Sequence, residues 1–209
     1  MSLMIEDFGG RLASVWSGLR PATRGLVERA MQARNTTVPN RNGNTSSVPY
    51  DARADRELSL LLSALDERVT ETDLARQRDD GKQLRQIAET CAAVLQEKTQ
   101  SAEVFTQLIR RADDQRDYAR IDALADALRR FSPTEVCELS RSEDAVVKAL
   151  ANEALAQFPT SVLIGLLSDP VDSDIAREAL RRQALEYGSE EARQIVSALD
   201  QMNLTQDDI

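Results

Sequence analysis

Three helical segments in the C-terminal half of the chain end on an aromatic residue, and a helix-breaking pair follows each one at once. The aromatics lie 27 and then 29 residues apart: Phe131, Phe158 and Tyr187. The breaks that follow are Ser132-Pro133, Pro159-Thr160 and Gly188-Ser189. Serine, proline and glycine at such positions end one helix and begin the next. The chain therefore alternates longer and shorter helices with a nearly constant period.

The apolar residues between these breaks follow helical spacing. We expect long helices over 116–131, 143–158 and 173–187, each followed by a shorter apolar helix. Aligning the closing aromatics brings three further columns into register: Leu128/Leu155/Ala184, Leu124/Ala151/Leu180 and Ala123/Leu150/Ala179. A single helical hairpin cannot bury its own apolar face, so hairpins of this kind must stack to form a core. The pattern predicts that the three aromatics occupy equivalent core sites.

This pattern resembles short HEAT-type repeats, in particular the compact bacterial ones. The resemblance covers residues 116–201 and, more loosely, 55–112. It implies an all-α fold, a short α-α superhelix of HEAT-like helical hairpins, used as a non-catalytic scaffold or adaptor that binds another protein or peptide. An irregular helical bundle is the alternative architecture.

The N-terminal part of the chain has a different character. Residues 1–34 form an amphipathic helical arm, in which Phe8, Leu12 and Trp16 share one face. Residues 35–54 are rich in Asn, Thr, Ser, Pro and Gly, which predicts a flexible linker. Residues 55–209 form the helical-repeat domain. Three roles for Trp16 stay open: a cap docked on the repeats, a partner-binding or oligomerising helix, and a membrane-surface helix.

Composition supports the all-α prediction and limits the chemistry. Only 8 glycines and 6 prolines occur in 209 residues, too few for the frequent turns of a β-sandwich or barrel. The chain has no histidine, which removes histidine-based catalysis and His-ligated metals, and it has no phosphate-binding glycine loop. We therefore expect no cofactor, no metal and no enzymatic activity. A thiol-dependent enzyme using Cys91 or Cys137 is the residual catalytic alternative.

No apolar run reaches the roughly 20 residues of a membrane span, and the N-terminus lacks the basic and apolar parts of a secretory signal. We expect a soluble cytoplasmic protein, in which Cys91 and Cys137 are buried, reduced thiols.

Charge argues against nucleic acid as the partner. The net charge is −9, and residues 57–209 carry 30 acidic against 18 basic side chains. Such a body repels a phosphate backbone. A nucleic-acid-associated helical-repeat protein is therefore the less favoured, alternative function. Four arginines flank one charged turn and form the candidate binding strip for an acidic peptide: Arg110, Arg111, Arg116 and Arg120. The competing interpretation is that they make ordinary solvated ion pairs.

Overall fold

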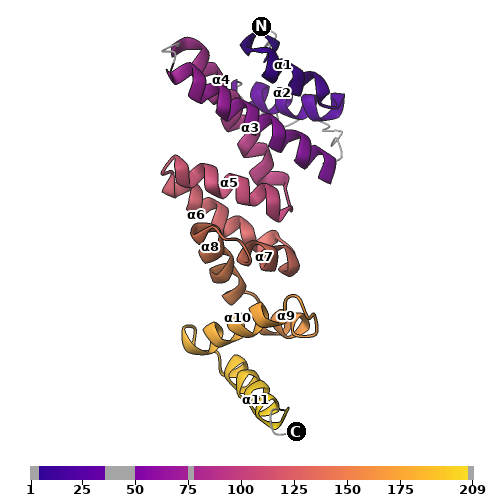
Figure 1. Ribbon diagram of the computed structural model, residues 1–209, viewed down its shortest axis with the longest axis vertical. Helices are drawn as coiled ribbons and strands as arrows, with labels where there is room; N and C mark the ends of the chain where they lie inside the picture. Colours follow the sequence, from indigo (N-terminus) through magenta and orange to yellow (C-terminus); the bar gives the residue numbers. More distant parts are fainter. Residues whose placement is uncertain (1–4, 36–49, 75–77, 207–209) are drawn as a thin grey trace. The chain divides into compact units, whose positions relative to one another are not determined.

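A computed structural model describes residues 5–35, 50–74 and 78–206, and all regular structure in these residues is helical (Figure 1). The all-α prediction is confirmed. The chain divides into two compact units, residues 1–104 (unit 1) and 105–209 (unit 2), and the division falls inside one helix.

Unit 1 is built around a pair of long helices. Its elements are η1 (Ile5–Phe8), α1 (Gly10–Gly18), α2 (Pro21–Asn35), α3 (Ala52–Leu74), α4 (Arg78–Lys98) and the first turn of α5 (Ala102–Asp114). Helices α3 and α4 pack together, α1 packs on α3, and α2 packs on α4. The interface contains the fully buried residues Leu58, Leu61, Leu62 and Leu65 of α3 and Leu84, Ile87 and Leu95 of α4. Both sets follow the i, i+3, i+4 spacing of one helix face, so α3 and α4 bury continuous stripes.

The amphipathic N-terminal segment belongs to this core. Leu12 and Trp16 of α1 are buried, with only 7% of Trp16 exposed, and Leu19 closes the same stripe. The stripe is too apolar to leave in water, and α1 meets α3 of its own chain. The structure thus places Trp16 in the core of unit 1.

The predicted domain division differs from the one observed. We expected an arm over 1–34, a linker over 35–54 and one repeat domain over 55–209. Instead α1 and α2 share a unit with α3 and α4, because they supply apolar faces to it. Helix α3 already begins at Ala52, inside the predicted linker, whereas residues 36–49 lie outside the described residues.

A polar cluster joins the α1–α2 corner to the start of α3. The Arg20 guanidinium donates to Glu57 Oε1 at 3.0 Å and to Asp51 Oδ1 at 2.6 Å, and the Thr23 hydroxyl donates to Glu57. Hydrogen bonds from Arg20 and from the Ala54 amide lower the pKa of Asp51. Partial burial opposes a similar change at Glu57, but hydrogen bonds from Thr23 and Arg20 still hold its pKa below the ordinary value. The cluster therefore requires both carboxylates to be ionised.

This cluster predicts that α1 docking is acid-sensitive. Because folding lowers both pKa values, the stabilisation is complete above the unfolded pKa values of about 4 and is lost as the pH falls through the folded ones. Trp16, the single tryptophan, reports the docking. We expect blue-shifted emission at pH 7 and a red shift in acid. Arg20→Ala should move the midpoint to higher pH, whereas Arg29→Ala, at an exposed position of α2, should not. An unchanged midpoint in Arg20→Ala would show that the apolar stripe alone holds α1.

Unit 2 is a succession of shorter helices. After α5 come α6 (Tyr118–Ala127), η2 (Leu128–Arg130), α7 (Pro133–Ser140), α8 (Ala145–Ala156), α9 (Thr160–Leu166), α10 (Ser173–Leu185) and α11 (Glu190–Gln206). Helices α6, α8 and α10 meet in chain order, and α7 meets α9. The prediction of a shorter helix after 173–187 is wrong, because α11 has 17 residues and α10 has 13.

Aspartates mark the starts of α6, α8 and α10. They are Asp117, Asp144 and Asp172, spaced 27 and 28 residues apart. Asp117 accepts from the Arg120 amide, and Asp144 accepts from the amides of Val146 and Val147. Such caps satisfy amides that have no partner within the helix. Asp172 differs, because its carboxylate instead accepts from Arg141 at 2.6 Å.

The predicted local signals at the breaks are present. Ser132 caps α7 by accepting from the Glu135 amide, with Pro133 at the first helical position. Gly188 has a φ of +66°, the left-handed conformation that ends a helix, and the Ser189 hydroxyl accepts from the Ala192 amide at the start of α11.

The predicted columns agree with the structure in two cases of three. Leu128/Leu155/Ala184 and Leu124/Ala151/Leu180 are buried throughout, whereas in the third column Ala123 is exposed and Ala179 buried.

The predicted equivalence of the closing aromatics is wrong. Phe131 is buried, with its ring centre 4.6 Å from that of Phe105, but Phe158 is only half-buried and Tyr187 is 50% exposed. The Tyr187 hydroxyl donates to Glu153 on α8. A phenol seeks a polar partner that a phenylalanine does not need, so Tyr187 bridges two helix surfaces.

The two aromatics should therefore differ in mutational cost. Phe131→Ala removes a buried ring and should cost about 3–5 kcal/mol. Tyr187→Ala removes a half-exposed side chain and should lower the melting temperature much less. Urea unfolding of both variants followed by circular dichroism measures the difference. Equal losses would restore the equivalence that the sequence predicted.

Candidate functional site

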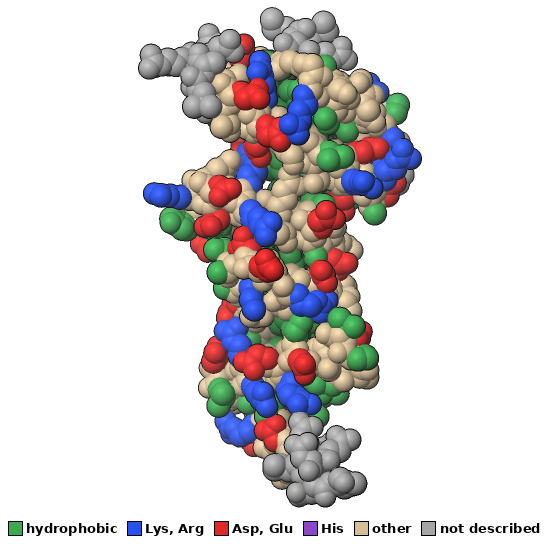
Figure 2. Space-filling model, viewed as in Figure 1, with side chains coloured by type: hydrophobic (Ala, Val, Ile, Leu, Met, Phe, Trp, Pro, Cys, Tyr) green, Lys and Arg blue, Asp and Glu red, His purple; other side chains and the backbone are tan. Residues whose placement is uncertain are grey.

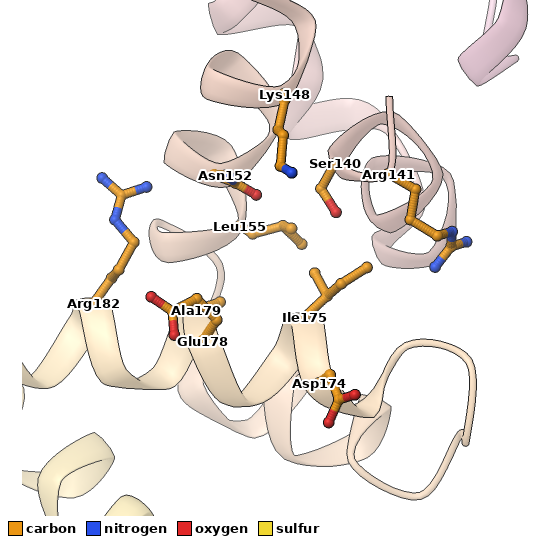
Figure 3. Close-up of a pocket in the computed structure, with 10 residues that line it drawn as sticks. All are labelled: Ser140, Arg141, Lys148, Asn152, Leu155, Asp174, Ile175, Glu178, Ala179 and Arg182. Atoms are coloured by element: carbon orange, nitrogen blue, oxygen red, sulfur yellow. The ribbon is translucent and has the colours of Figure 1, made fainter. Parts of the chain in front are cut away.

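A pocket of about 320 Å³ opens between α8, α10 and the C-terminal end of α7 (Figure 3). It lies wholly within unit 2. The lining residues are Ser140, Arg141, Lys148, Asn152, Leu155, Asp174, Ile175, Glu178, Ala179 and Arg182.

Helical spacing builds the walls of this pocket. On α8, Lys148, Asn152 and Leu155 follow one another at intervals of four and three residues and so share a face. On α10, Ile175 and Ala179 lie one turn apart and supply the facing apolar surface. Leu155 and Ala179 are buried and Ile175 half-buried, which gives the pocket an apolar floor.

Two arginines at the rim are held by carboxylates. Arg141 binds Asp172 at 2.6 Å and Glu138 at 2.8 Å, and the hydrogen bond to Asp172 is the main cause of its raised pKa. Arg182 binds Glu186 at 2.9 Å and Glu153 at 3.0 Å. In Figure 3 both guanidinium groups point away from the pocket. Their charge is directed toward neighbouring carboxylates.

Lys148 is the cation that faces the pocket. Its side chain extends from α8 toward the pocket centre, beside Asn152 and Ser140 (Figure 3). Within the described part of the chain the Lys148 ammonium makes no ion pair of 4.0 Å or less, and the side-chain amide of Asn152 makes no hydrogen bond. Asp144 lies one turn before Lys148, but it accepts from two α8 amides and from Arg110 at 3.1 Å. The Val147 amide is the main cause of the lowered pKa of Asp144, and the Arg110 hydrogen bond adds to it.

The α10 wall carries the opposite charge. Asp174 and Glu178 lie one turn apart on α10 and both line the pocket. Glu178 approaches Arg181 only to 3.9 Å, a long and exposed contact. In Figure 3 the Asp174 carboxylate points away from the pocket, so Glu178 supplies the negative charge of the α10 wall opposite Lys148 on α8.

The four arginines of the predicted binding strip do not share one environment. Arg110 is exposed on α5 and paired with Asp144, whereas Arg111 is buried and its Nη1 lies 3.4 Å from Gln115 Oε1. Arg116 sits in the α5–α6 turn with a φ of +55°, and Arg120 is half-buried in the first turn of α6. Neighbouring positions on a helix point in different directions, which separates Arg110 from Arg111.

The two thiols are sequestered. Cys91 is buried and its Sγ donates to the Leu58 carbonyl at 3.4 Å. Burial, assisted by the nearby charge of Asp172, raises the pKa of Cys137 to about 12. Since the thiolate is the nucleophile, Cys137 is unreactive at neutral pH.

Two further searches cover the described residues only. No group of histidine, cysteine, aspartate and glutamate side chains is arranged to hold a metal ion. No helix there combines the length and the apolar character needed to cross a membrane.

The sequence did not single out the pocket. One signal was present: Lys148 is one of three lysines in a chain of 26 basic residues. Spacing alone would have paired it with Asp144, because an acid one turn before a lysine is a favourable helical pair. Comparisons with models of protein families, with curated proteins and with solved structures found no match.

Both cysteines should resist alkylation in the folded protein. A rise in the Cys137 pKa from 9.0 to about 12 leaves about a thousandfold less thiolate. We expect almost no iodoacetamide labelling at pH 8 without denaturant and complete labelling of both residues in urea, measured by intact mass. Rapid labelling of the folded chain would revive the thiol-dependent alternative.

Proposed function

We propose that this protein is a non-catalytic interaction scaffold and that the α8–α10 pocket receives part of another protein. The observation that carries the proposal is an apolar floor beside two polar groups, Lys148 and Asn152, that have no partner among the described residues. Binding sites combine apolar surface with a few such polar groups, which fix the orientation of the ligand.

The hairpin order of unit 2 supports the scaffold role. We infer that α6 to α11 form HEAT-like repeats, because Asp117, Asp144 and Asp172 recur at nearly equal spacing and α6, α8 and α10 meet in sequence. Stacked hairpins present extended surfaces suited to protein partners. The step from fold to function is an analogy, so the pocket carries the greater weight.

The chemistry of the pocket also favours binding. The Ser140 hydroxyl donates to the Cys137 carbonyl oxygen within α7. Its proton is therefore not directed at a general base. Cys137 itself is buried and protonated at neutral pH. Buried reduced thiols suit a reducing cytoplasm, which is where we place the protein.

Nucleic acid remains the less favoured partner. On the face drawn in Figure 2, basic and acidic side chains are interspersed and the basic ones do not form a continuous patch. Arg110, Arg141 and Arg182 are already paired with carboxylates. Phosphate binding draws on cations that are available to release counterions, and these are not.

Site-specific crosslinking in the native host tests the proposal. A photoreactive amino acid at Asn152 should form an adduct with a protein, whereas the same group at exposed Glu191 on α11 should not. Ala179→Trp places a large ring against the apolar floor and should abolish the Asn152 adduct, with circular dichroism confirming the fold. Equal adducts at both positions, or an Asn152 adduct unaffected by Ala179→Trp, would contradict the assignment.

A further inference from the structure

We infer that the α8–α10 pocket selects its partner by charge order: it takes a segment with an aliphatic anchor flanked by an acidic residue on one side and a basic residue on the other. This inference rests on the proposed function and names the chemistry of the partner. The acidic residue faces Lys148 on α8, and the basic residue faces Glu178 on α10.

The size and floor of the pocket define the anchor. A volume of about 320 Å³ is at the lower end for ligand pockets, so it holds one or two side chains. The floor is formed by Leu155, Ile175 and Ala179, which are aliphatic. An aliphatic anchor gains from removing this surface from water, and a charged anchor would lose its hydration without a partner.

The positive wall defines the acidic flank. Lys148 is exposed, points into the pocket and has no ion pair among the described residues. The carboxylate one turn away, Asp144, already receives three hydrogen bonds. The side-chain amide of Asn152 also lines the pocket, one helical turn after Lys148, so a carboxylate that meets Lys148 finds a further donor there.

The negative wall defines the basic flank. Glu178 supplies the carboxylate on this flank, and its ion pair with Arg181 is long, at 3.9 Å. Asp174 also lines the pocket, but its carboxylate points away from Lys148 (Figure 3). The other lining cations, Arg141 and Arg182, are each held between two carboxylates outside the pocket. A basic side chain on this flank therefore gains the Glu178 carboxylate and competes only with the long Arg181 contact.

The same arrangement rejects partners of a single sign. A uniformly acidic peptide would place carboxylates against Glu178, and a uniformly basic one would place cations against Lys148. Like charges brought together at an interface reduce affinity for the wrong partner. This revises the acidic-peptide preference that the arginine strip predicted, because the pocket carries both signs.

A peptide selection on the full-length chain tests the inference. Phage-displayed random peptides are selected on the wild-type protein and counter-selected on Ala179→Trp, and the best binder is measured by fluorescence anisotropy. We expect selected sequences to place an aliphatic residue between an acidic and a basic one. Neutralising either charged residue of the peptide should weaken binding about fivefold, since a partly exposed ion pair contributes up to about 1 kcal/mol.

Charge exchange in the protein provides the matched comparison. Lys148→Glu combined with Glu178→Lys should prefer a peptide with its two charges exchanged over the original, reversing the wild-type order. Lys82→Glu, an exposed lysine on α4 of unit 1, should leave both affinities unchanged.

The outcomes separate the inference from the proposed function. Peptides that lose binding in Ala179→Trp but tolerate neutralised or same-sign charges would overturn the charge order and leave the pocket as a docking site. Failure to recover any peptide sensitive to Ala179→Trp would overturn the docking site itself.

Discussion

Three arginines that each bridge two carboxylates hold the helices of this protein in register. Arg20 joins Asp51 and Glu57 in unit 1, Arg141 joins Asp172 and Glu138 in unit 2, and Arg182 joins Glu153 and Glu186. A planar guanidinium with five donors can serve two carboxylates at once, which a lysine ammonium does with less geometric definition. In each case one of the carboxylates lies on another helix or at its start, so the arginine fixes one helix against the next.

The pocket in unit 2 depends on two of these bridges. Arg141 ties the end of α7 to the start of α10 through Asp172, and Arg182 ties the last turn of α10 to α8 through Glu153. Gln183 adds a third tie, since its amide donates to the carbonyl oxygens of Ala156 and Phe158. These contacts set the separation of α8 and α10, while the short Ala179 side chain leaves space between them. The bridges thus create the pocket and also draw two arginines out of it.

Sequence periodicity predicted where the helices lie, but it predicted little about which surface side chains contact one another. The apolar spacing predicted helices over 116–131, 143–158 and 173–187, where α6, α8 and α10 lie, because burial of a continuous stripe repeats every three to four residues. Ser132-Pro133 and Gly188-Ser189 predicted two helix boundaries, because helix capping depends on residues close together in the sequence. Tyr187 was misassigned because its hydroxyl bond to Glu153 joins residues 34 positions apart. The pocket was missed for a related reason: Arg182 has acids one turn away on either side, and spacing does not reveal that it also reaches Glu153 on α8.

Position 148 is a lysine, whereas the residues that bridge two carboxylates in this protein are arginines. An arginine there would have five donors with which to bridge Asp144 and the carboxylates across the pocket, and it would close the groove from within. A lysine is a compact, strongly hydrated point charge on a flexible stem, so its ammonium can stay in solvent. The residues that bridge helices are therefore arginines paired twice, whereas the residue that faces the pocket is a lysine. The acid one turn before it, Asp144, is held at the start of α8 by two amides and by Arg110. The ammonium of Lys148 lies more than 4.0 Å from this carboxylate, so the same contacts that cap α8 hold Asp144 out of an ion pair with Lys148.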